Sequence, residues 1–556
     1  MGDRSEIFNA LRANPEVSVL IIGAGINGIG TFRDLALQGV DVLLVDRRDF
    51  CSGASAASSH MVHGGIRYLE NGEFRLVREA VRERNHLIQN APHYVKPLKT
   101  TIPIFKWFSG LFNAPMKFLG IRDHPSERGA LVIKIGLQLY DSYTRSQGTV
   151  PKHQMKLRQK SLEQFPQLNP EIICTATYYD AAMSMPERIC IDLILDAEAD
   201  SSEAKAINYV QAVGASGDAI ALRDELTSES FNVKPKLVIN AAGPWIDITN
   251  KALGQETRFI GGTKGSHLVL HHPHLYEAIR DHEFFFENED GRIVLIYPLL
   301  GKVLVGTSDI RIEDPDQARC TEEEVDYFLV MIHKVFPTIE VNRSHIVHVF
   351  SGVRPLHSSE ASHTGQISRD HSIRVVEDGE DLEFPIFCLV GGKWTTYRYF
   401  SEQVTDRVLA HLGLNRRNST EDLPIGGGRG YPEKGREEEW LDALQEKFGT
   451  SREQSKALFD RYGTRSAEVA AFISEVDDAP LRHHPDFSRR EVLFLVEEEK
   501  VLHLDDLVFR RSSLAKLGEL TPELLTELSK VLGDALSWTQ DTREWEIART
   551  LRFLRS

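Results

Sequence analysis

The sequence predicts an α/β protein in three parts: a Rossmann-like dinucleotide-binding domain, a second domain around a mostly antiparallel sheet, and a C-terminal all-α domain. Three observations lead to this prediction. An apolar run from Val17 is followed by a glycine-rich turn, a helix-like stretch and a second apolar run. Short apolar runs separated by turns fill residues 264–309. Beyond residue 430 apolar residues recur at helical spacing.

The first apolar run opens a dinucleotide-binding fingerprint. Gly23 permits a tight turn, Gly25 lets backbone N–H groups approach a pyrophosphate, and Gly28 lets the helix pack on the strand. The helix N-terminus favours phosphate through its unsatisfied N–H groups and its dipole. Asp46 ends the second run, where an acidic side chain accepts hydrogen bonds from the hydroxyls of an adenosine ribose. This fingerprint does not separate FAD from NAD.

Length and composition limit the classes of function. The chain has 556 residues, enough for two or three domains, and a net charge of −16, which argues against general nucleic-acid binding. Its five cysteines form no C-x-x-C pair, so we expect neither a disulfide framework nor a metal site. We find no secretory signal and no run of apolar residues long enough to span a bilayer. These features predict a cytoplasmic protein or one attached to a membrane surface.

The segment that follows Asp46 is small, hydroxylated and rich in glycine. Residues 51–67 read CSGASAASSHMVHGGIR. A chain with little side-chain bulk can run close beside a large flat ligand, and its hydroxyls and amides can bind a pyrophosphate. We therefore predict cofactor contacts for Ser55, Ser58, Ser59, His63 and Gly64. The alternative is a flexible linker, which would not need the histidines and arginine found here.

Together these motifs resemble one family. GAGINGIG, followed by GASAASSHMVHGGIRYLENGEFRLVREA, is similar to the FAD-dependent glycerol-3-phosphate dehydrogenases, the membrane-associated and quinone-linked kind. Later segments resemble that family in the same order, namely NAAGPW, KGSH, GTSD, SGVRPL, SRD and GGKWTTYR. One position departs, because this chain has His60 where the family usually has Lys. The resemblance covers most of the chain and implies FAD, held in a domain of the glutathione-reductase or D-amino-acid-oxidase type.

Two further segments are expected beside the cofactor. KLVIN reads as a buried strand, and the small residues Ala242 and Gly243 that follow it can pass close under a cofactor. Gly391 and Gly392 precede Lys393, at a point where backbone can approach a flavin and a helix can begin. The resemblance adds Lys393 and Thr395 to the cofactor contacts.

Cations in the later motifs suit a phosphorylated substrate, because a phosphate dianion favours bidentate arginines and a lysine point charge. The candidates are Arg67, Arg354, Arg369 and Lys393. Taken singly, each is more often part of a surface ion pair. The resemblance implies that they converge over the redox ring, and it adds Tyr68 to the substrate contacts. We assign catalytic roles to Arg67, Arg354, Lys393 and His63.

The role of His63 rests on residue type. Histidine has an ordinary pKa near neutrality, so His63 is our candidate for the base. Contact with the flavin without proton transfer is the alternative.

The reaction implied by the resemblance is oxidation of sn-glycerol 3-phosphate to dihydroxyacetone phosphate, with hydride transfer to flavin and electrons passed to a membrane quinone. An oxidase that reduces oxygen, or a dehydrogenase of another polyol phosphate, is the alternative among enzymes. A non-enzymatic flavin-binding scaffold is a third class, which the retention of all four cations disfavours. A homodimer is compatible with the sequence.

A basic, aromatic-rich segment is the candidate for membrane attachment. Between Lys96 and Lys160 there are twelve Lys or Arg residues and three acids. Residues 104–120, IFKWFSGLFNAPMKFLG, interleave aromatic and aliphatic residues with two lysines, which suits an interface with anionic lipid. The alternative is that these apolar groups belong to the core of the second domain.

Changes in sequence character set the expected domain boundaries. We expect a catalytic region at 1–414, a polar, Gly- and Pro-containing linker at 415–429, and a C-terminal α-helical domain at 430–556, where Thr521 precedes Pro522 as an N-cap. Within the catalytic region, the FAD-binding part is expected at about 15–95, 186–262 and 350–414, and the substrate-binding part at about 96–185 and 263–349. Residues 171–353 are expected to consist mainly of strands, with one long helix from Pro186 to about Ala204.

Overall fold

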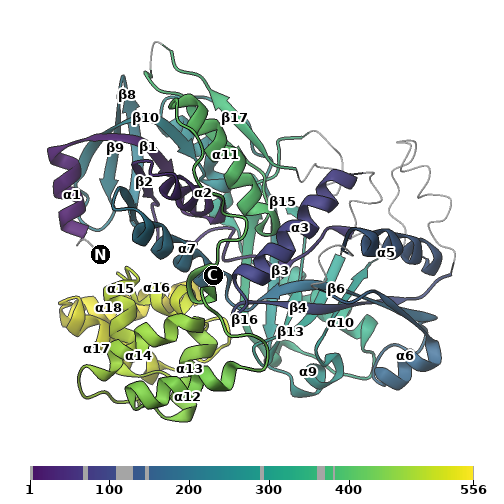
Figure 1. Ribbon diagram of the computed structural model, residues 1–556. Coiled ribbons are helices and arrows are strands. Elements are labelled where there is room, and N and C mark those ends of the chain that lie inside the picture. The colour runs from purple at the N-terminus through teal and green to yellow at the C-terminus, as the bar shows by residue number, and fades with distance from the viewer. Residues whose placement is uncertain are drawn as a thin grey trace.

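Two sheets and a helical region make up the computed structural model (Figure 1). It describes residues 4–66, 73–107, 129–144, 150–288, 293–359, 370–379 and 382–554. Within these ranges no helix combines the length and the apolar character needed to cross a membrane.

The first sheet is the predicted dinucleotide-binding sheet, with strand order β17-β18-β10-β1-β2-β7. Its strands are β1 Glu16–Ile22, β2 Val42–Val45, β7 Ala204–Ile207, β10 Ser230–Asn240, β17 Ser372–Val376 and β18 Ile386–Val390. From β7 to β18 neighbouring strands run parallel, whereas β17 is antiparallel to β18. The hairpin of β8 Val210–Ser216 and β9 Ala219–Asp224 extends from the long strand β10. Because β1 lies centrally, its carboxyl end faces the crevice where such sheets bind dinucleotides.

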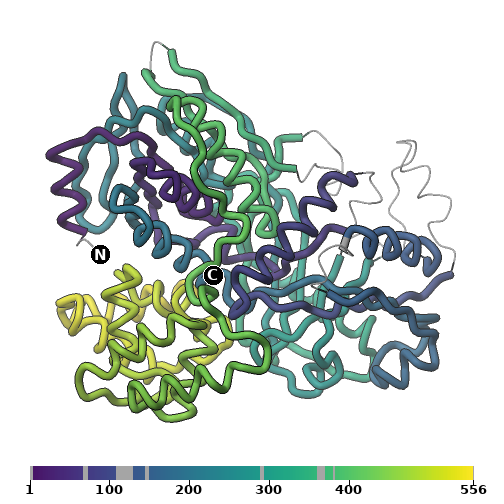
Figure 2. The backbone as a smooth tube through the Cα atoms, in the orientation of Figure 1, coloured from purple at the N-terminus to yellow at the C-terminus, as the bar shows by residue number. Residues whose placement is uncertain are grey.

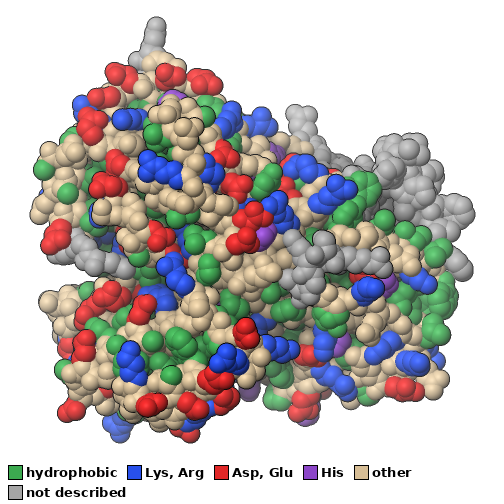
Figure 3. All heavy atoms as spheres, in the orientation of Figure 1, with side chains coloured by type: hydrophobic (Ala, Val, Ile, Leu, Met, Phe, Trp, Pro, Cys, Tyr) green, Lys and Arg blue, Asp and Glu red, His purple; other side chains and the backbone are tan. Residues whose placement is uncertain are grey.

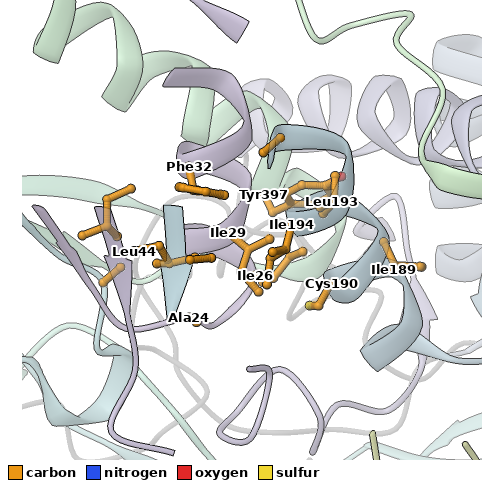
Figure 4. Close-up of a cluster of buried hydrophobic side chains, with 14 of the residues drawn as sticks. Ala24, Ile26, Ile29, Phe32, Leu44, Ile189, Cys190, Leu193, Ile194 and Tyr397 are labelled. Carbon is orange, nitrogen blue, oxygen red and sulfur yellow. The ribbon is translucent and has the colours of Figure 1, made fainter. Parts of the chain in front are cut away.

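Helices cover both faces of this sheet. On one face lie α2 Ile26–Leu37, α7 Pro186–Asp200 and α11 Tyr397–His411, and Figure 4 shows apolar side chains of these helices in one cluster with Leu44 of β2. On the other face, α1 Arg4–Ala13 and α8 Ile246–Ala252 close a second cluster with the β8–β9 hairpin. Strands buried on both sides explain the nearly continuous apolar runs that the sequence shows.

The second sheet has ten described strands in the order β15-β11-β14-β13-β12-β4-β6-β3, with β16 beside β11 and β5 beside β6. Its strands are β3 Met61–Val62, β4 Val95–Ile104, β5 Gln154–Leu157, β6 Cys174–Met183, β11 Thr263–Leu270, β12 His282–Glu287, β13 Ile293–Leu299, β14 Lys302–Gly306, β15 Ile310–Arg311 and β16 Ile346–Arg354. Among these, β12 and β4 pair parallel, and the other pairs are antiparallel. The mostly antiparallel character is as predicted.

Helices packed on the second sheet correct part of the prediction. The expectation of one long helix is wrong, because α10 Glu322–Val335 also covers this sheet, together with the shorter α6 Arg158–Gln164 and α9 Pro273–Ile279. Near β4 and β6 lie α3 Phe74–Asn90 and α5 Ala130–Thr144. The predicted helix from Pro186 stops at Asp200, which leaves room for β7 from Ala204. Strand β16, expected from residue 350 onward in the FAD-binding part, pairs with β11 of the second sheet.

The C-terminal region is helical, as expected. It contains α12 Glu437–Phe448, α13 Arg452–Tyr462, α14 Ser466–Ser474, α15 Arg489–Glu498, α16 Leu504–Asp506, a π-helix at Leu507–Arg511, α17 Pro522–Ala535 and α18 Gln540–Leu554. Thr521 caps α17 through its side chain. Figure 2 shows this region, green to yellow, lying against α7 of the first sheet.

Buried ion pairs join the C-terminal region to the catalytic region. Arg188 of α7 binds Glu499 through two N–H···O contacts, one of 2.9 Å. Asp49 accepts from Arg510 Nε at 2.5 Å and from Arg511 Nη1 at 2.7 Å. The side chains of these five residues are at most 10% exposed. Buried charges are therefore part of this interface.

Candidate active site

The glycine-rich turn joins β1 to α2 and has no room for side chains at two positions. Gly23 has a φ of +108°, and a Cβ atom there would lie 2.7 Å from the backbone of Ala241. A Cβ atom on Gly28 would lie 2.0 Å from the carbonyl oxygen of Gly23, so α2 packs directly on the turn. Gly25 is the N-cap of α2. The turn therefore presents backbone at a helix N-terminus, as pyrophosphate binding requires.

Asp46 lies at the carboxyl end of β2 and braces this turn. Its carboxylate accepts the N–H of Ala24 at 2.7 Å and the N–H of Arg48 at 2.9 Å. Burial raises the pKa of Asp46 to about 6, although both hydrogen bonds and the charge of Arg47 oppose the shift. The position next to the turn fits an acid that binds the ribose. Ribose binding itself stays a prediction.

The serine-rich segment runs past the same helix N-terminus. Ser55 Oγ accepts the N–H of Ile26 at 2.9 Å, and a Cβ atom on Gly25 would lie 3.3 Å from that oxygen. At Gly64 a Cβ atom would lie 2.0 Å from the Tyr140 hydroxyl, so a side chain is excluded there as well. The low bulk of this segment thus serves close packing.

The end of this segment is anchored to the second sheet. Ser59 Oγ lies 2.7 Å from Nε2 of His267, and the Tyr297 hydroxyl donates to the Ser59 carbonyl oxygen at 3.1 Å. Ser58 Oγ accepts the N–H of His60 at 3.3 Å. These contacts bring the cofactor side of the molecule against the sheet predicted to bind substrate.

The segment Ala241–Gly243 and the loop at Gly391 complete the surroundings of the turn. A Cβ atom on Gly23 would lie 2.8 Å from Cα of Ala242, and Gly243 follows with a φ of +58°. Asn27 Nδ2, in α2, donates to the Gly391 carbonyl oxygen at 3.2 Å. Gly392 has a φ of +94°, and a Cβ atom there would lie 2.5 Å from Asn27 Nδ2.

Residues after Gly392 close this arrangement. Trp394 Nε1 donates to the Ser55 carbonyl oxygen at 2.9 Å, and Thr395 Oγ1 accepts the N–H of His63 at 3.2 Å. Segments that are more than 300 residues apart in the chain are thereby interlocked at one helix N-terminus. The structure brings together the described cofactor candidates, and their contacts with FAD stay predictions.

Arg354 ends β16, and its guanidinium is fixed on the second sheet. It donates to Thr307 Oγ1 at 2.9 Å and to the Ser308 carbonyl oxygen at 3.2 Å, and it pairs with Asp309 at 3.2 Å. The side chain lies over Gly265, where a Cβ atom would come within 2.3 Å of Nη2. It is 24% exposed, so this preorganised cation is accessible to an anion.

Lys393 lies in a neighbouring loop. The N–H of Gly391 donates to the Pro355 carbonyl oxygen at 3.0 Å, which joins the loop of Lys393 to the end of β16. Lys393 is also close to α3, because its charge is among those that oppose the rise of the pKa of Glu79 to about 7, a rise caused by burial. Convergence of Lys393 and Arg354 on one phosphate stays a prediction. Arg67, Tyr68 and Arg369 lie outside the described residues.

His267 lies beside the cofactor segment, and residue-by-residue reasoning did not single it out, although its motif, KGSH, was part of the resemblance. Its ring stacks on Phe350 with centroids 4.8 Å apart and planes 13° apart. Burial, followed by the charges of Arg354 and Lys516, lowers the pKa of His267 to about 3. The imidazole is therefore neutral at neutral pH, and a pKa this low makes it a weak base.

The residues present fit FAD. Where the cofactor's pyrophosphate is expected, the chain offers a helix N-terminus and glycines at which added Cβ atoms would meet backbone or Ser55. Where the ribose is expected, it offers a carboxylate. Ser59, later in the same segment as Ser55, contacts His267 of the second sheet.

Comparisons with known proteins agree with this geometry. Residues 18–382 match the family model of the FAD dependent oxidoreductases, and residues 418–543 match the model described as the C-terminal domain of alpha-glycerophosphate oxidase. A protein of Synechocystis sp. named glycerol-3-phosphate dehydrogenase is 33% identical, over 96% of both chains. A protein of Brucella abortus named D-erythritol 1-phosphate dehydrogenase is 29% identical, over 90% of this chain and 95% of its own.

A solved structure supports the fold. The glycerol-3-phosphate dehydrogenase from Bacillus halodurans, crystallised with FAD, superposes with a TM-score of 0.76 at 21% identity, over 99% of this chain and 97% of that one. The α/β FAD-binding fold, with a substrate sheet and a C-terminal helical region, is confirmed. The cofactor is FAD. The chain belongs to the FAD-dependent glycerol-3-phosphate dehydrogenase family.

Proposed function

We propose that this protein oxidises sn-glycerol 3-phosphate to dihydroxyacetone phosphate. The observation that carries the proposal is the pairing of a fixed cation with a neutral imidazole at the cofactor cradle. Arg354 and His267 stand on adjacent strands β16 and β11, and His267 contacts Ser59 of the cofactor segment. The names of the Synechocystis and Bacillus halodurans proteins support the choice of substrate.

The proposed roles follow from these side chains. Arg354 binds the phosphate through its planar fork of N–H donors, and Lys393 adds a second charge. A histidine takes the proton of the C2 hydroxyl; His63 is the first candidate, and His267 is a second because it contacts Ser59 of the cofactor segment, although its low pKa makes it a weak base. Bound FAD supplies the acceptor for the hydride from C2. Cations close to the reacting oxygen stabilise the negative charge that develops there.

Substitution at Arg354 tests substrate binding. Arg354→Ala should lower kcat/KM roughly 30- to 1000-fold, because a charge-assisted bidentate contact is lost. This corresponds to a loss of about 2–4 kcal/mol in transition-state stabilisation. Arg354→Lys should recover part of that loss, since it keeps the charge and loses the fork. Unchanged kcat/KM in Arg354→Ala would place the phosphate elsewhere.

Substitution of the two histidines separates the candidates for the base. His267→Gln and His63→Gln should each be measured by the rate of anaerobic flavin reduction and by substrate affinity. The residue that acts as base should slow reduction by about 10²–10⁴-fold with little change in affinity. A comparable small effect of both variants would exclude both assignments.

A second substrate has a specific observation in its favour, namely the Brucella abortus relative named D-erythritol 1-phosphate dehydrogenase. We therefore propose that specificity be measured with both phosphates and with glycerol. A preference for erythritol 1-phosphate in kcat/KM would transfer the assignment to that polyol. Glycerol, which lacks the phosphate, should be a poor substrate in either case.

The proposed electron acceptor is a membrane quinone, which requires docking on a bilayer. Of the predicted segment 104–120, residues 108–120 lie outside the described part of the chain. Trp107 is 48% exposed, and an apolar stripe of α5, Leu131, Ile135 and Leu139, is 40–49% exposed at a spacing of four residues. In Figure 3 hydrophobic side chains, in green, are exposed at the right of the molecule, where Figure 1 places α5. Burying such side chains in a lipid interface supports reversible attachment.

Liposome binding tests this docking surface. Trp107→Ser, Ile135→Ser and Leu139→Ser together should release the protein from anionic liposomes and reduce quinone turnover, while flavin reduction by glycerol 3-phosphate survives. The matched control replaces exposed apolar residues elsewhere, Leu226, Val330 and Leu414, by Ser. Equal binding of both variants would contradict the surface. Oxygen consumption that exceeds quinone reduction would favour an oxidase.

A further inference from the structure

A lysine from the C-terminal region reaches the cofactor segment. Lys516 lies in the turn between the π-helix and α17, and its side chain is 11% exposed. Its Nζ is 2.9 Å from Nε2 of His60 and 2.7 Å from Oε1 of Glu187, in the first turn of α7. Gly518 packs this turn against β16, because a Cβ atom there would lie 2.5 Å from Val347.

The hydrogen bonds of His60 define its tautomer. Nδ1 is 3.0 Å from the Met183 carbonyl oxygen, which can only accept, so Nδ1 carries the hydrogen. Nε2 then has a lone pair, and the Lys516 ammonium donates to it. The side chain is fully buried, and the N–H of Met183 donates back to the His60 carbonyl oxygen at 2.8 Å. The end of the serine-rich segment is thus held by β6 on one side and by Lys516 on the other.

The same ammonium lies close to the proposed substrate side. Its Nζ is 5.7 Å from the centroid of the Phe350 ring, and Phe350 stacks on His267. The groups that face the His267 imidazole are Arg354 from β16, Lys516 from the C-terminal region, and Ser59 and His60 from the cofactor segment. Burial is the largest cause of the lowered pKa of His267, and Lys516 acts in the same direction as Arg354.

We propose that Lys516 is a positioning residue of the catalytic centre: its ammonium group, supplied by the C-terminal helical region, fixes His60 and thereby holds the serine-rich segment against the FAD site. Position 60 carries an imidazole in this chain, and the positive charge beside it comes from a different part of the chain. The inference concerns FAD binding and depends on the proposed function only where it extends to His267.

The alternative is that Lys516 has a purely structural role, which would give a different experimental result. Lys516 could serve just to neutralise the buried carboxylate of Glu187, in which case removing both charges together should be harmless. A second ion pair offers the matched control, since Lys500 of the C-terminal region binds Glu198 of the same helix α7 at 2.6 Å. Lys500 is 18% exposed and Glu198 is 11% exposed, so the two pairs are alike in burial.

Titration of FAD into the apoprotein, without substrate, tests the proposal. Four variants are compared with the parent: Lys516→Met, Lys516→Met with Glu187→Gln, Lys516→Met with His60→Lys, and the control Lys500→Met with Glu198→Gln. Thermal unfolding of each apoprotein reports stability separately. Lys516→Arg, which keeps the charge, is the conservative variant.

We expect Lys516→Met to weaken FAD binding about tenfold or more, which is 1.4 kcal/mol. The Glu187→Gln double variant should remain weakened, whereas His60→Lys with Lys516→Met, which returns an ammonium from position 60, and Lys516→Arg should bind FAD within about threefold of the parent. The control should also bind within about threefold even where it lowers the unfolding temperature.

Two results would overturn the proposal. If the Glu187→Gln double variant binds FAD as tightly as the parent, Lys516 only balances that carboxylate. If His60→Lys fails to restore binding in a protein that unfolds cooperatively, a charge at this place is not what holds the segment. Because no substrate is present, a protein that does not oxidise glycerol 3-phosphate can still support or refute the role of Lys516.

Discussion

Two aspartates, three residues apart, differ in almost every respect. Asp46 sits at the cofactor turn, accepts backbone N–H groups, and has a pKa raised to about 6 because burial outweighs those hydrogen bonds. Asp49 sits at the interface with the C-terminal region. Burial would raise its pKa too, but the charges of Arg511 and Arg510 outweigh this effect and hold the pKa well below its ordinary value. The one environment is built from local backbone, the other from distant charges.

The difference shows how each region is specified. The partners of the Asp46 carboxylate, Ala24 and Arg48, are 22 and two positions away, whereas the arginines that bind Asp49 are 461 and 462 positions away. A ligand site made of backbone needs small residues at fixed spacing, and this leaves a motif. A charged interface needs complementary partners that meet in space. Because these partners can lie anywhere in the chain, they produce no recognisable motif in the sequence.

The largest expected effect comes from the interface. Asp49→Asn leaves two buried guanidiniums without their carboxylate, so we expect a loss of about 3–5 kcal/mol in the free energy of unfolding. Because its folded-state pKa is depressed, the stabilisation by Asp49 should be complete above about pH 4 and decline as the pH falls further. Urea unfolding of the variant and of the exposed-pair control Asp460→Asn measures this. A loss below 1 kcal/mol would contradict the account.

Asp46 should show the opposite dependence in the apoprotein. The pKa of Asp46 is raised in the folded state. Between about pH 4 and pH 6 the folded form therefore retains a proton that the unfolded chain has already released. Stability should therefore fall as the pH rises through this window, by up to about 2 kcal/mol, and Asp46→Asn should lack that fall. Unfolding at several pH values checks this, and parallel curves for parent and variant would refute it.

Substitutions at the glycines of the cofactor turn should differ in their effect on stability and FAD content. Gly28→Ala places a methyl group against the Gly23 carbonyl oxygen and should lower stability and FAD content together, by about 1–3 kcal/mol of strain. Gly25→Ala meets only Ser55 Oγ at 3.3 Å and should have the smaller effect, while Gly25→Val should yield cofactor-poor protein. Flavin content per folded protein measures both. Equal occupancy in Gly28→Ala and the parent would contradict this packing.

Much of the cofactor side was predictable from the sequence. The strand, turn, helix and acid from Val17 to Asp46 appear where the spacing places them, because each glycine has a steric reason at its position. The cations of the substrate side were found by residue type and resemblance. Of these, Arg354 ends β16 and Lys393 lies in the loop joined to that strand end, whereas the other two lie outside the described residues.

The rest depended on contacts between distant parts of the chain. The involvement of His267 becomes visible once β11 is placed beside β16, and Lys516 gains meaning through its contact with His60, 456 positions away. The helix α10 was missed although it carries a full capping box at Thr321 and Glu324, which is a local signal that the sequence does contain. The basic composition of residues 96–160 pointed to a surface, but not to the exposed stripe of α5.

Anaerobic mixing of the FAD-loaded protein with sn-glycerol 3-phosphate tests the central claim most directly. Reduction removes the visible absorbance band of the flavin, so we expect rapid bleaching by glycerol 3-phosphate and little bleaching by glycerol at the same concentration. Addition of a quinone should restore the band. A flavin that keeps its absorbance with glycerol 3-phosphate, in protein with full FAD occupancy, would contradict the proposed reaction.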